Sequence, residues 1–331
     1  MTIEIGLAGW GDHDSLYAPR TKPGDKLAEY ASHFPVVEVD STFYAIQPRE
    51  RFAKWVEDTP PTLHFVVKAY QGMTGHARGA AAAQNAGDAQ VMYDAFRRML
   101  EPAMEAGRLA AALFQYPPWF DCTAPNVKLL RETKKRMEGY PCALEFRHQS
   151  WFAGELREKT LRFMREEGWI HSICDEPQAG EGSVPEVLQA TDDEVSIVRM
   201  HGRNAAGWNS GGAPNWRDVR YLYRYSDEEL AEWADKLRLL EQQSRRVAVI
   251  FNNNSGGDAA DNAKRRRPRR GGQADDGAAR PDTAGRQETH REAAGAAGAF
   301  LNEASRLGER RIRGWRTIFA GRTSACRFAR E

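Results

Sequence analysis

The sequence has few cysteines and no apolar stretch long enough to cross a membrane. Its four cysteines, Cys122, Cys142, Cys174 and Cys326, form no Cys-x-x-Cys pair and indicate no disulfide framework. The chain starts with a strand-like stretch that has neither a charged leader nor the apolar core of a signal peptide. We therefore expect a soluble protein of a reducing compartment, the cytoplasm, with no membrane contact.

The motifs of several large enzyme classes are also missing. No Gly-x-Gly-x-x-Gly or Walker pattern occurs, so we expect no nucleotide cofactor. No Gly-x-Ser-x-Gly supports a nucleophilic serine, and no His-x-His or His-Glu-x-x-His spacing supports a local metal site. The sequence therefore predicts no cofactor of any kind.

The formal net charge of +1 over 331 residues averages two unlike regions. From Lys264 onward the chain carries 17 basic and 8 acidic residues, which leaves a mildly acidic body. An acidic body argues against a broad contact with a phosphate backbone. Nucleic acid is therefore expected only as a partner of the basic tail.

Eight short apolar runs end in polar residues, and segments with helical spacing of apolar residues separate them. The runs are Ile3–Gly9, Val36–Val39, Leu63–Lys68, Ala110–Gln115, the stretch from Cys142 to Trp151, Ile170–Asp175, Ser196–Gly202 and Val247–Phe251. Such alternation within about 264 residues is typical of a (β/α)8 TIM-type barrel, an α/β fold with its site at the strand C-termini. We predict this barrel over residues 1–264, with a long Gly-, Asn- and Trp-rich loop, Asn204–Trp216, as a candidate lid or binding loop.

Residues 265–331 do not fit the barrel. Arg, Gly, Ala and Asp dominate the first half of this tail, and such a composition cannot bury enough apolar surface to offset the entropy of ordering. One interpretation is a disordered basic arm; the other is a shifted reading frame of a GC-rich gene. We favour the second, because the break falls inside a helix that the barrel needs. An in-frame full-length native product would contradict it.

Several blocks together resemble the YecE-like family, catalogued as domain of unknown function 72. They are Gly9-Trp10, Val37–Tyr44, Phe114–Pro118, Glu145–Trp151, Arg199–Gly202, Tyr225–Leu230 and Phe251–Asn254. The resemblance implies a TIM-type barrel and no established activity. The sequence departs from the family pattern mainly after Lys264, and it has Asp40 where members often have Asn.

Ionisable residues stand at nearly every strand end. Side chains two apart on a strand share a face, as do Glu38 with Asp40, Glu145 with Arg147, and Arg199 with His201. We predict that these faces converge inside the barrel top. The predicted catalytic residues are Glu145, His201, Asp175 and Glu38; the predicted substrate-binding residues are Lys68, Arg147, His148, Arg199, Gln115, Asn252, Trp10 and Tyr44.

Three functions remain open at this point. The first is a metal-independent enzyme acting on a small anionic substrate, phosphorylated or carboxylated, with Glu145 and His201 as the acid–base pair. The second is a non-enzymatic ligand- or nucleic-acid-binding protein. The third is a divalent-metal hydrolase or isomerase of the xylose-isomerase type, although Arg147 and Lys68 would repel a cation. Structurally, Glu145 with Arg147, or Glu38 with Arg199, could instead be buried ion pairs that hold the barrel top together.

Overall fold

The computed structural model describes residues 1–76, 89–209 and 219–266. The chain divides into two units, Met1–Arg269 and Arg270–Glu331, and the second lies outside the described residues. The predicted tail beyond residue 266 and residues 210–218 of the predicted binding loop are therefore also outside them.

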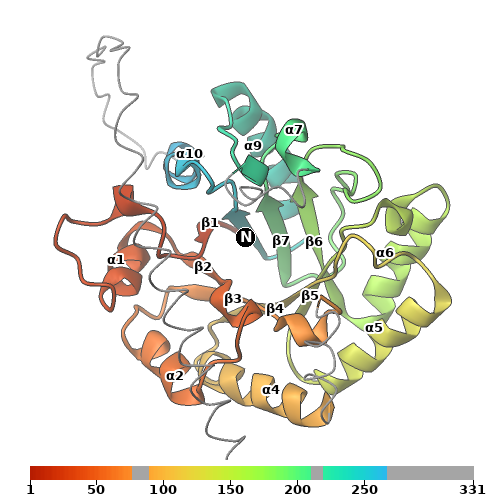
Figure 1. Cartoon of the computed structure of the whole chain (residues 1–331), viewed down its shortest axis with the longest axis horizontal. Coiled ribbons are helices and arrows are strands. Elements are labelled where there is room, and N and C mark those ends of the chain that lie inside the picture. The colour runs from red at the N-terminus through yellow and green to blue at the C-terminus, as the bar shows by residue number, and fades with distance from the viewer. Residues whose placement is uncertain (77–88, 210–218, 267–331) are drawn as a thin grey trace, which may run out of the picture. The chain divides into compact units, whose positions relative to one another are not determined.

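Eight parallel strands form a closed barrel in chain order (Figure 1). They are β1 (Thr2–Ala8), β2 (Val36–Val39), β3 (His64–Lys68), β4 (Leu109–Gln115), β5 (Cys142–Glu145), β6 (Trp169–Asp175), β7 (Val195–Met200) and β8 (Arg246–Phe251). Pairing of β8 with β1 closes the ring, for example at Ile5 and Val249. The predicted TIM-type barrel is confirmed, with strand ends that differ by a residue or two from those predicted.

Helices surround the strands (Figure 1). They are α1 (Lys26–His33), α2 (Arg49–Glu57), α4 (Ala89–Glu105), α5 (Ala124–Arg136), α6 (Leu156–Glu167), α7 (Ala205–Trp208), α9 (Asp227–Glu241) and α10 (Asp258–Arg266), with 3-10 turns η1 (Asp14–Leu16), η2 (Ser41–Phe43), η3 (Gln71–Met73) and η4 (Gln149–Phe152). The predicted capping box at Ser226 and Glu229 opens α9. Within the described part of the chain, every helix is too short or too polar to span a membrane.

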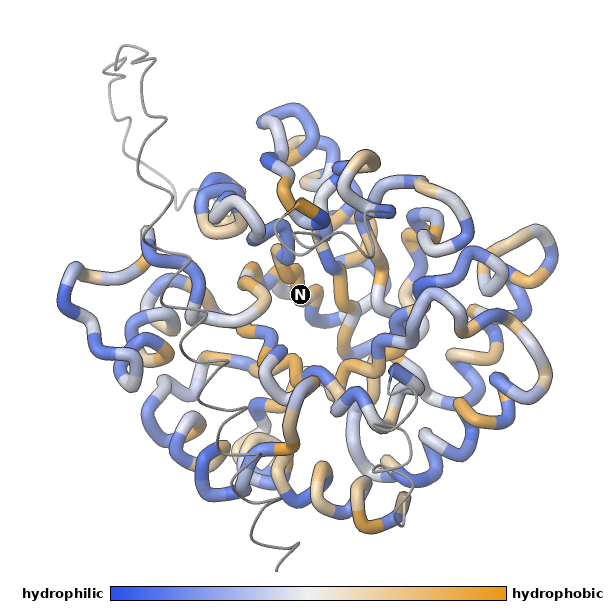
Figure 2. The backbone as a smooth tube through the Cα atoms, viewed as in Figure 1, coloured by the Kyte–Doolittle hydropathy of each residue, from blue (hydrophilic) through white to orange (hydrophobic). Residues whose placement is uncertain are grey.

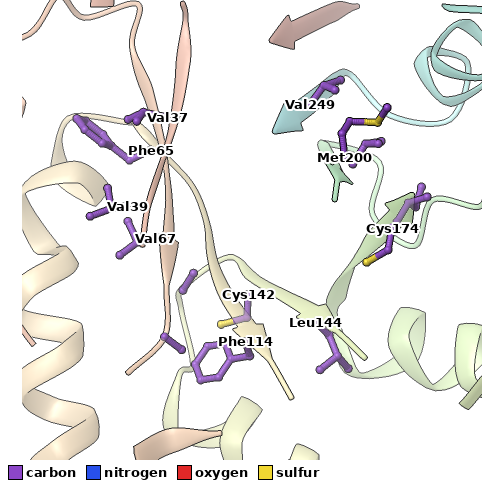
Figure 3. Close-up of a cluster of buried hydrophobic side chains, with 14 of the residues drawn as sticks. Val37, Val39, Phe65, Val67, Phe114, Cys142, Leu144, Cys174, Met200 and Val249 are labelled. Carbon is purple, nitrogen blue, oxygen red and sulfur yellow. The ribbon is translucent and has the colours of Figure 1, made fainter. Parts of the chain in front are cut away.

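The buried apolar residues form two layers. The larger layer lies between the strands and the helices and includes Val37, Val67 and Leu144 (Figure 3). Figure 2 shows the same pattern: hydrophobic residues (orange) concentrate on the strands and the inner helix faces, and hydrophilic residues (blue) lie outside. In α10, Ala259, Ala260 and Ala263 belong to this layer.

The second, smaller layer fills the inside of the barrel. Four of its members stand two positions before polar or charged residues and so share a strand face with them: Val36 before Glu38, Val66 before Lys68, Ala143 before Glu145, and Ile197 before Arg199. The apolar filling therefore ends where the polar residues begin. The polar side chains therefore lie above an apolar floor, the inner layer, at the C-terminal end of the strands, where TIM barrels have their sites.

Candidate functional site

Arg199 of β7 joins two carboxylates from other strands. Its Nε and Nη2 donate to the two oxygens of Glu38, at 2.8 and 2.6 Å. Its Nη1 lies 2.9 Å from each oxygen of Glu145. All three side chains are buried. The bidentate contact ties β2 to β7 and β5 at the top of the barrel.

Arg147 extends this network. Its Nε donates to Glu145 at 2.8 Å and its Nη1 to Glu176 at 2.5 Å. Its Nη2 lies 3.1 Å from Nε2 of His201. Its guanidinium also lies over the ring of Trp208, 5.4 Å from the centroid. Both ion pairs that the sequence left as alternatives, Glu145 with Arg147 and Glu38 with Arg199, are present.

Glu145 is the centre of the network and stays ionised. Burial alone would raise its pKa, but the charges of Arg199 and Arg147 outweigh burial and hold the pKa well below its usual range. Its second oxygen also accepts a hydrogen bond from Ser172 at 3.1 Å. A carboxylate with this many donors is a poor proton acceptor.

His201 is neutral and fully buried. Burial, and then Arg147 and Arg199, hold its pKa well below the usual value. Both ring nitrogens face nitrogen donors, with Nε2 3.1 Å from Nη2 of Arg147 and Nδ1 2.9 Å from Nδ2 of Asn252, and the neutral ring can accept from only one of them. His201 and Glu145 are neighbours, as predicted, with Nε2 and Oε1 3.5 Å apart. The side chains of Glu145 and His201 are both surrounded by protein groups that already contact their polar atoms.

Lys68 differs from the two arginines. It is partly exposed at the end of β3, and its ammonium lies 4.8 Å from the centroid of the Phe43 ring. Within residues 1–76, 89–209 and 219–266, its Nζ has no hydrogen bond and no ion pair. Burial, and then the charge of Arg199, lower its pKa. Lys68 is thus a cation at the barrel top without a carboxylate partner in the described chain.

Two further titratable groups belong to this region. Burial, and then the charge of Glu38, raise the pKa of Asp40. Burial would raise the pKa of Tyr221, but Arg147, Arg220 and Lys68 outweigh it and lower that pKa. A carboxylic acid whose pKa is raised, close to an amine and a phenol whose pKa values are lowered, is typical of a proton-transfer site.

The placement of Asp175 in the inward cluster was wrong. Its carboxylate accepts hydrogen bonds from Nε of Arg203 at 2.9 and 3.1 Å, because it lies on the opposite face of β6 from Ser172. The next residue, Glu176, occupies the inward position instead. Burial raises its pKa to about 7, although Arg147 and the backbone amide of Val184 oppose this.

The other predicted binding residues divide into two groups. Gln115 and Asn252 join the network, since Gln115 accepts from Arg199 at 3.3 Å and Asn252 contacts His201. Trp10, His148 and Tyr44 do not. Trp10 packs edge-on against Trp55 of α2, His148 accepts from the Ser150 amide at the start of η4, and Tyr44 is 61% exposed.

The sequence analysis missed three residues besides Glu176. Trp208 of α7 is buried beneath Arg220, whose guanidinium lies 4.3 Å from the indole centroid, and the Tyr221 ring lies 5.9 Å from that of His201. Trp208 lies within the long loop that was predicted to cover the site. Tyr221 lies in a turn just after that loop, and Arg220 precedes it, so the spacing of apolar residues gave no signal for either.

One cluster of the described residues has metal-ligand types. A ligand atom from each of Glu145, Cys174 and His201 lies within 4.8 Å of the others. Both oxygens of Glu145 already accept from guanidinium groups, and burial raises the pKa of the Cys174 thiol well above its usual value. Two nearby cations and a protonated thiol make this cluster unsuited to a divalent ion.

Comparison with known proteins shows relatives without an assigned activity. The family model described as protein of unknown function DUF72 matches residues 4–284. UPF0759 protein YunF of Bacillus subtilis (strain 168) is 57% identical over 246 residues, which is 74% of this chain and 86% of the relative.

Two solved structures of family members share the fold. A DUF72 family protein from Enterococcus faecalis V583 has a TM-score of 0.74 and 38% identity, covering 80% of this chain and 94% of its own. One from Thermotoga maritima MSB8 has a TM-score of 0.68 and 29% identity, covering 80% and 98%. The chain therefore belongs to the DUF72 family, as its sequence blocks predicted.

Proposed function

We propose that this protein is a barrel enzyme that binds a small anionic molecule at the C-terminal ends of its strands, with Lys68 as the contact to the anion. The observation that carries this proposal is the unpaired ammonium of Lys68, partly exposed beside a network in which the other cations are taken. An ammonium that is largely removed from water without an ion-pair partner is costly, and an anionic ligand reduces that cost.

The proposal changes the roles of the two predicted arginine anchors. The N–H groups of Arg147 and Arg199 point at three glutamates, a histidine and Gln115. They hold the barrel top in place and have little capacity left for a ligand. A further cation of this region is Arg220, which lies beside Trp208 and Tyr221, forms no ion pair within the described residues and has an Nε without a hydrogen-bond partner there.

The acid–base roles change for the same reason. Glu145 and His201 were predicted as the pair, yet one is firmly ionised and the other firmly neutral. We propose that Asp40 and Tyr221 move protons instead, because both are partly exposed and their pKa values are shifted toward the neutral range. Glu145 and His201 then position Arg147 and Arg199.

A thermal-shift experiment on the full chain tests the anion contact. The probes are inorganic phosphate and a panel of phosphorylated and carboxylated metabolites, measured with the native protein, Lys68→Met and Lys159→Met. Lys159 is an exposed lysine paired with Glu155 on α6 and serves as the matched control. A ligand at a hundred times its Kd adds about 2.7 kcal/mol of stability.

We expect at least one anion to stabilise the native protein and Lys159→Met equally, and to leave Lys68→Met unchanged. A response of Lys68→Met equal to that of the native protein would remove Lys68 from the site. A folded native protein that no anion stabilises would contradict the proposed substrate class.

A further inference from the structure

Lys68 has an environment unlike that of the paired lysines of the described chain. Lys26, Lys54, Lys159 and Lys236 each lie within ion-pair distance of a carboxylate. The Nζ of Lys68 has no such partner in the part of the chain that the structure describes, and its nearest recorded contact is the face of Phe43.

The side chain of Lys68 lies on the inward face of β3, at the top of the barrel. Val66 lies two residues earlier on β3 and belongs to the layer that fills the barrel, so Lys68 points to the same side. The charges of Arg199, Glu38 and Tyr221 act on it from three other segments. A ligand held above the apolar floor would meet this amine.

We propose that the Nζ of Lys68 forms an imine with the carbonyl carbon of the substrate, which would be a small aldehyde or ketone carrying a carboxylate or phosphate. The inference rests on the proposed function and deepens it, since it names the reactive group that the anionic substrate must have. Enzymes activate a lysine either by burial against apolar groups or by a neighbouring cation. Lys68 has both, in Phe43 and Arg199, and its lowered pKa agrees with this.

The chemistry needs no other reactant. The neutral amine attacks the carbonyl carbon, a C–N bond forms, and the π electrons move to oxygen. The nitrogen then loses a proton and the oxygen gains one, which gives a carbinolamine. Loss of the hydroxyl as water, driven by the nitrogen lone pair, gives the C=N bond. Carbonyl and amine thus become imine and water without a change of redox state, and Asp40 and Tyr221 are placed to move the protons.

The protonated imine keeps a positive charge at the same place. It therefore still attracts the anionic group of the substrate, while it withdraws electrons from the adjacent carbon. This effect favours removal of a proton or cleavage of a bond next to the former carbonyl. Arg220 is the second cation available to the anionic group.

Borohydride trapping tests the proposal. The full-length protein is incubated with glyoxylate, pyruvate or dihydroxyacetone phosphate together with sodium borohydride, which reduces an imine to a stable amine. Intact mass and peptide mapping then locate the adduct. With at least one probe we expect labelling of Lys68 more than tenfold above that of Lys159, and protection of Lys68 by excess inorganic phosphate.

Lys68→Arg separates this inference from the proposed function. An arginine keeps the positive charge but cannot form an imine. We expect it to retain stabilisation by anions and to lose the adduct. Anion stabilisation that depends on Lys68, combined with no adduct or with adducts spread over the exposed lysines, would overturn the imine and leave the anion site. Absence of both would overturn both.

Discussion

Replacement of Arg199 by methionine would show how much the barrel top depends on its buried network. The change keeps a long flexible side chain but removes the five N–H donors. Glu38 would lose both of its recorded ion-pair contacts, and Glu145 would keep its ion pair with Arg147 and its hydrogen bond from Ser172. A buried carboxylate would thus remain without a counter-charge.

The expected cost is large because both carboxylates are fully buried. Removal of one partner from a buried ion pair destabilises by about 3–5 kcal/mol. For a domain of this size, 1 kcal/mol corresponds to about 2–4 °C in Tm, so we expect a fall of about 10 °C.

Two comparisons make the measurement decisive. Arg131→Met removes an exposed arginine that pairs with Glu167 at 2.7 Å, and it should cost less than about 1 kcal/mol. The double variant Glu38→Gln with Arg199→Met should recover part of the loss, since the unpaired charge is gone. Urea or thermal unfolding of the four proteins checks this. If Arg199→Met costs no more than Arg131→Met, the network does not stabilise the barrel.

Three other outcomes follow from the structure. Gly6→Ala should cost at least about 3 kcal/mol or prevent folding, because the new Cβ would lie 1.9 Å from the Val36 carbonyl oxygen; a stable variant in thermal unfolding would contradict this. Ser226→Ala should cost about 1 kcal/mol in urea unfolding, through loss of the hydrogen bond to the Glu229 amide; no loss would mean that the cap is not formed. His171 has a pKa lowered to about 4 by burial, so the unfolded chain binds the extra proton and stability falls as pH drops from about 6.5 to 4. His171→Gln should reduce this slope, and an unchanged slope would exclude His171 as its source.

The barrel could be predicted because its signals are local. Each strand is a short apolar run, and each run lies between segments whose apolar residues recur at helical spacing. The ends were less certain. The fourth and sixth strands begin one residue earlier than predicted, at Leu109 and Trp169, because apolar character alone does not show where hydrogen bonding starts.

The site was predictable in position and only partly in its contacts. Strand ends placed Glu38, Glu145, Arg147 and Arg199 together, because parallel strands end at one edge of the barrel. The choice of Asp175 over its neighbour failed because β6 is buried on both faces, so hydrophobicity does not reveal which face points inward. The alternation from Ser172 would have selected Glu176.

Contacts made by irregular segments had no comparable signal. Arg220 and Tyr221 lie between α7 and α9, where the sequence shows no repeat of apolar residues, yet both interact electrostatically with Arg147. Both contact Trp208: the Arg220 guanidinium lies over its ring, and the Tyr221 ring lies edge-on to it. Such a contact follows from the complete fold and not from residue spacing.

The buried network and Lys68 form one electrostatic system. Arg147 and Arg199 face the three carboxylates of Glu38, Glu145 and Glu176, so the network carries one negative charge when Glu176 is ionised and none when it is protonated. The same charges act on Lys68, since Arg199 lowers its pKa while Glu38 and Glu145 raise it. Arg199 therefore has two effects that share one cause: it stabilises the carboxylates, and it keeps the neighbouring amine closer to its neutral form. A protein that needed only a stable barrel top would gain nothing from leaving a lysine beside this guanidinium. The placement costs stability, and it makes chemical sense where the amine must react.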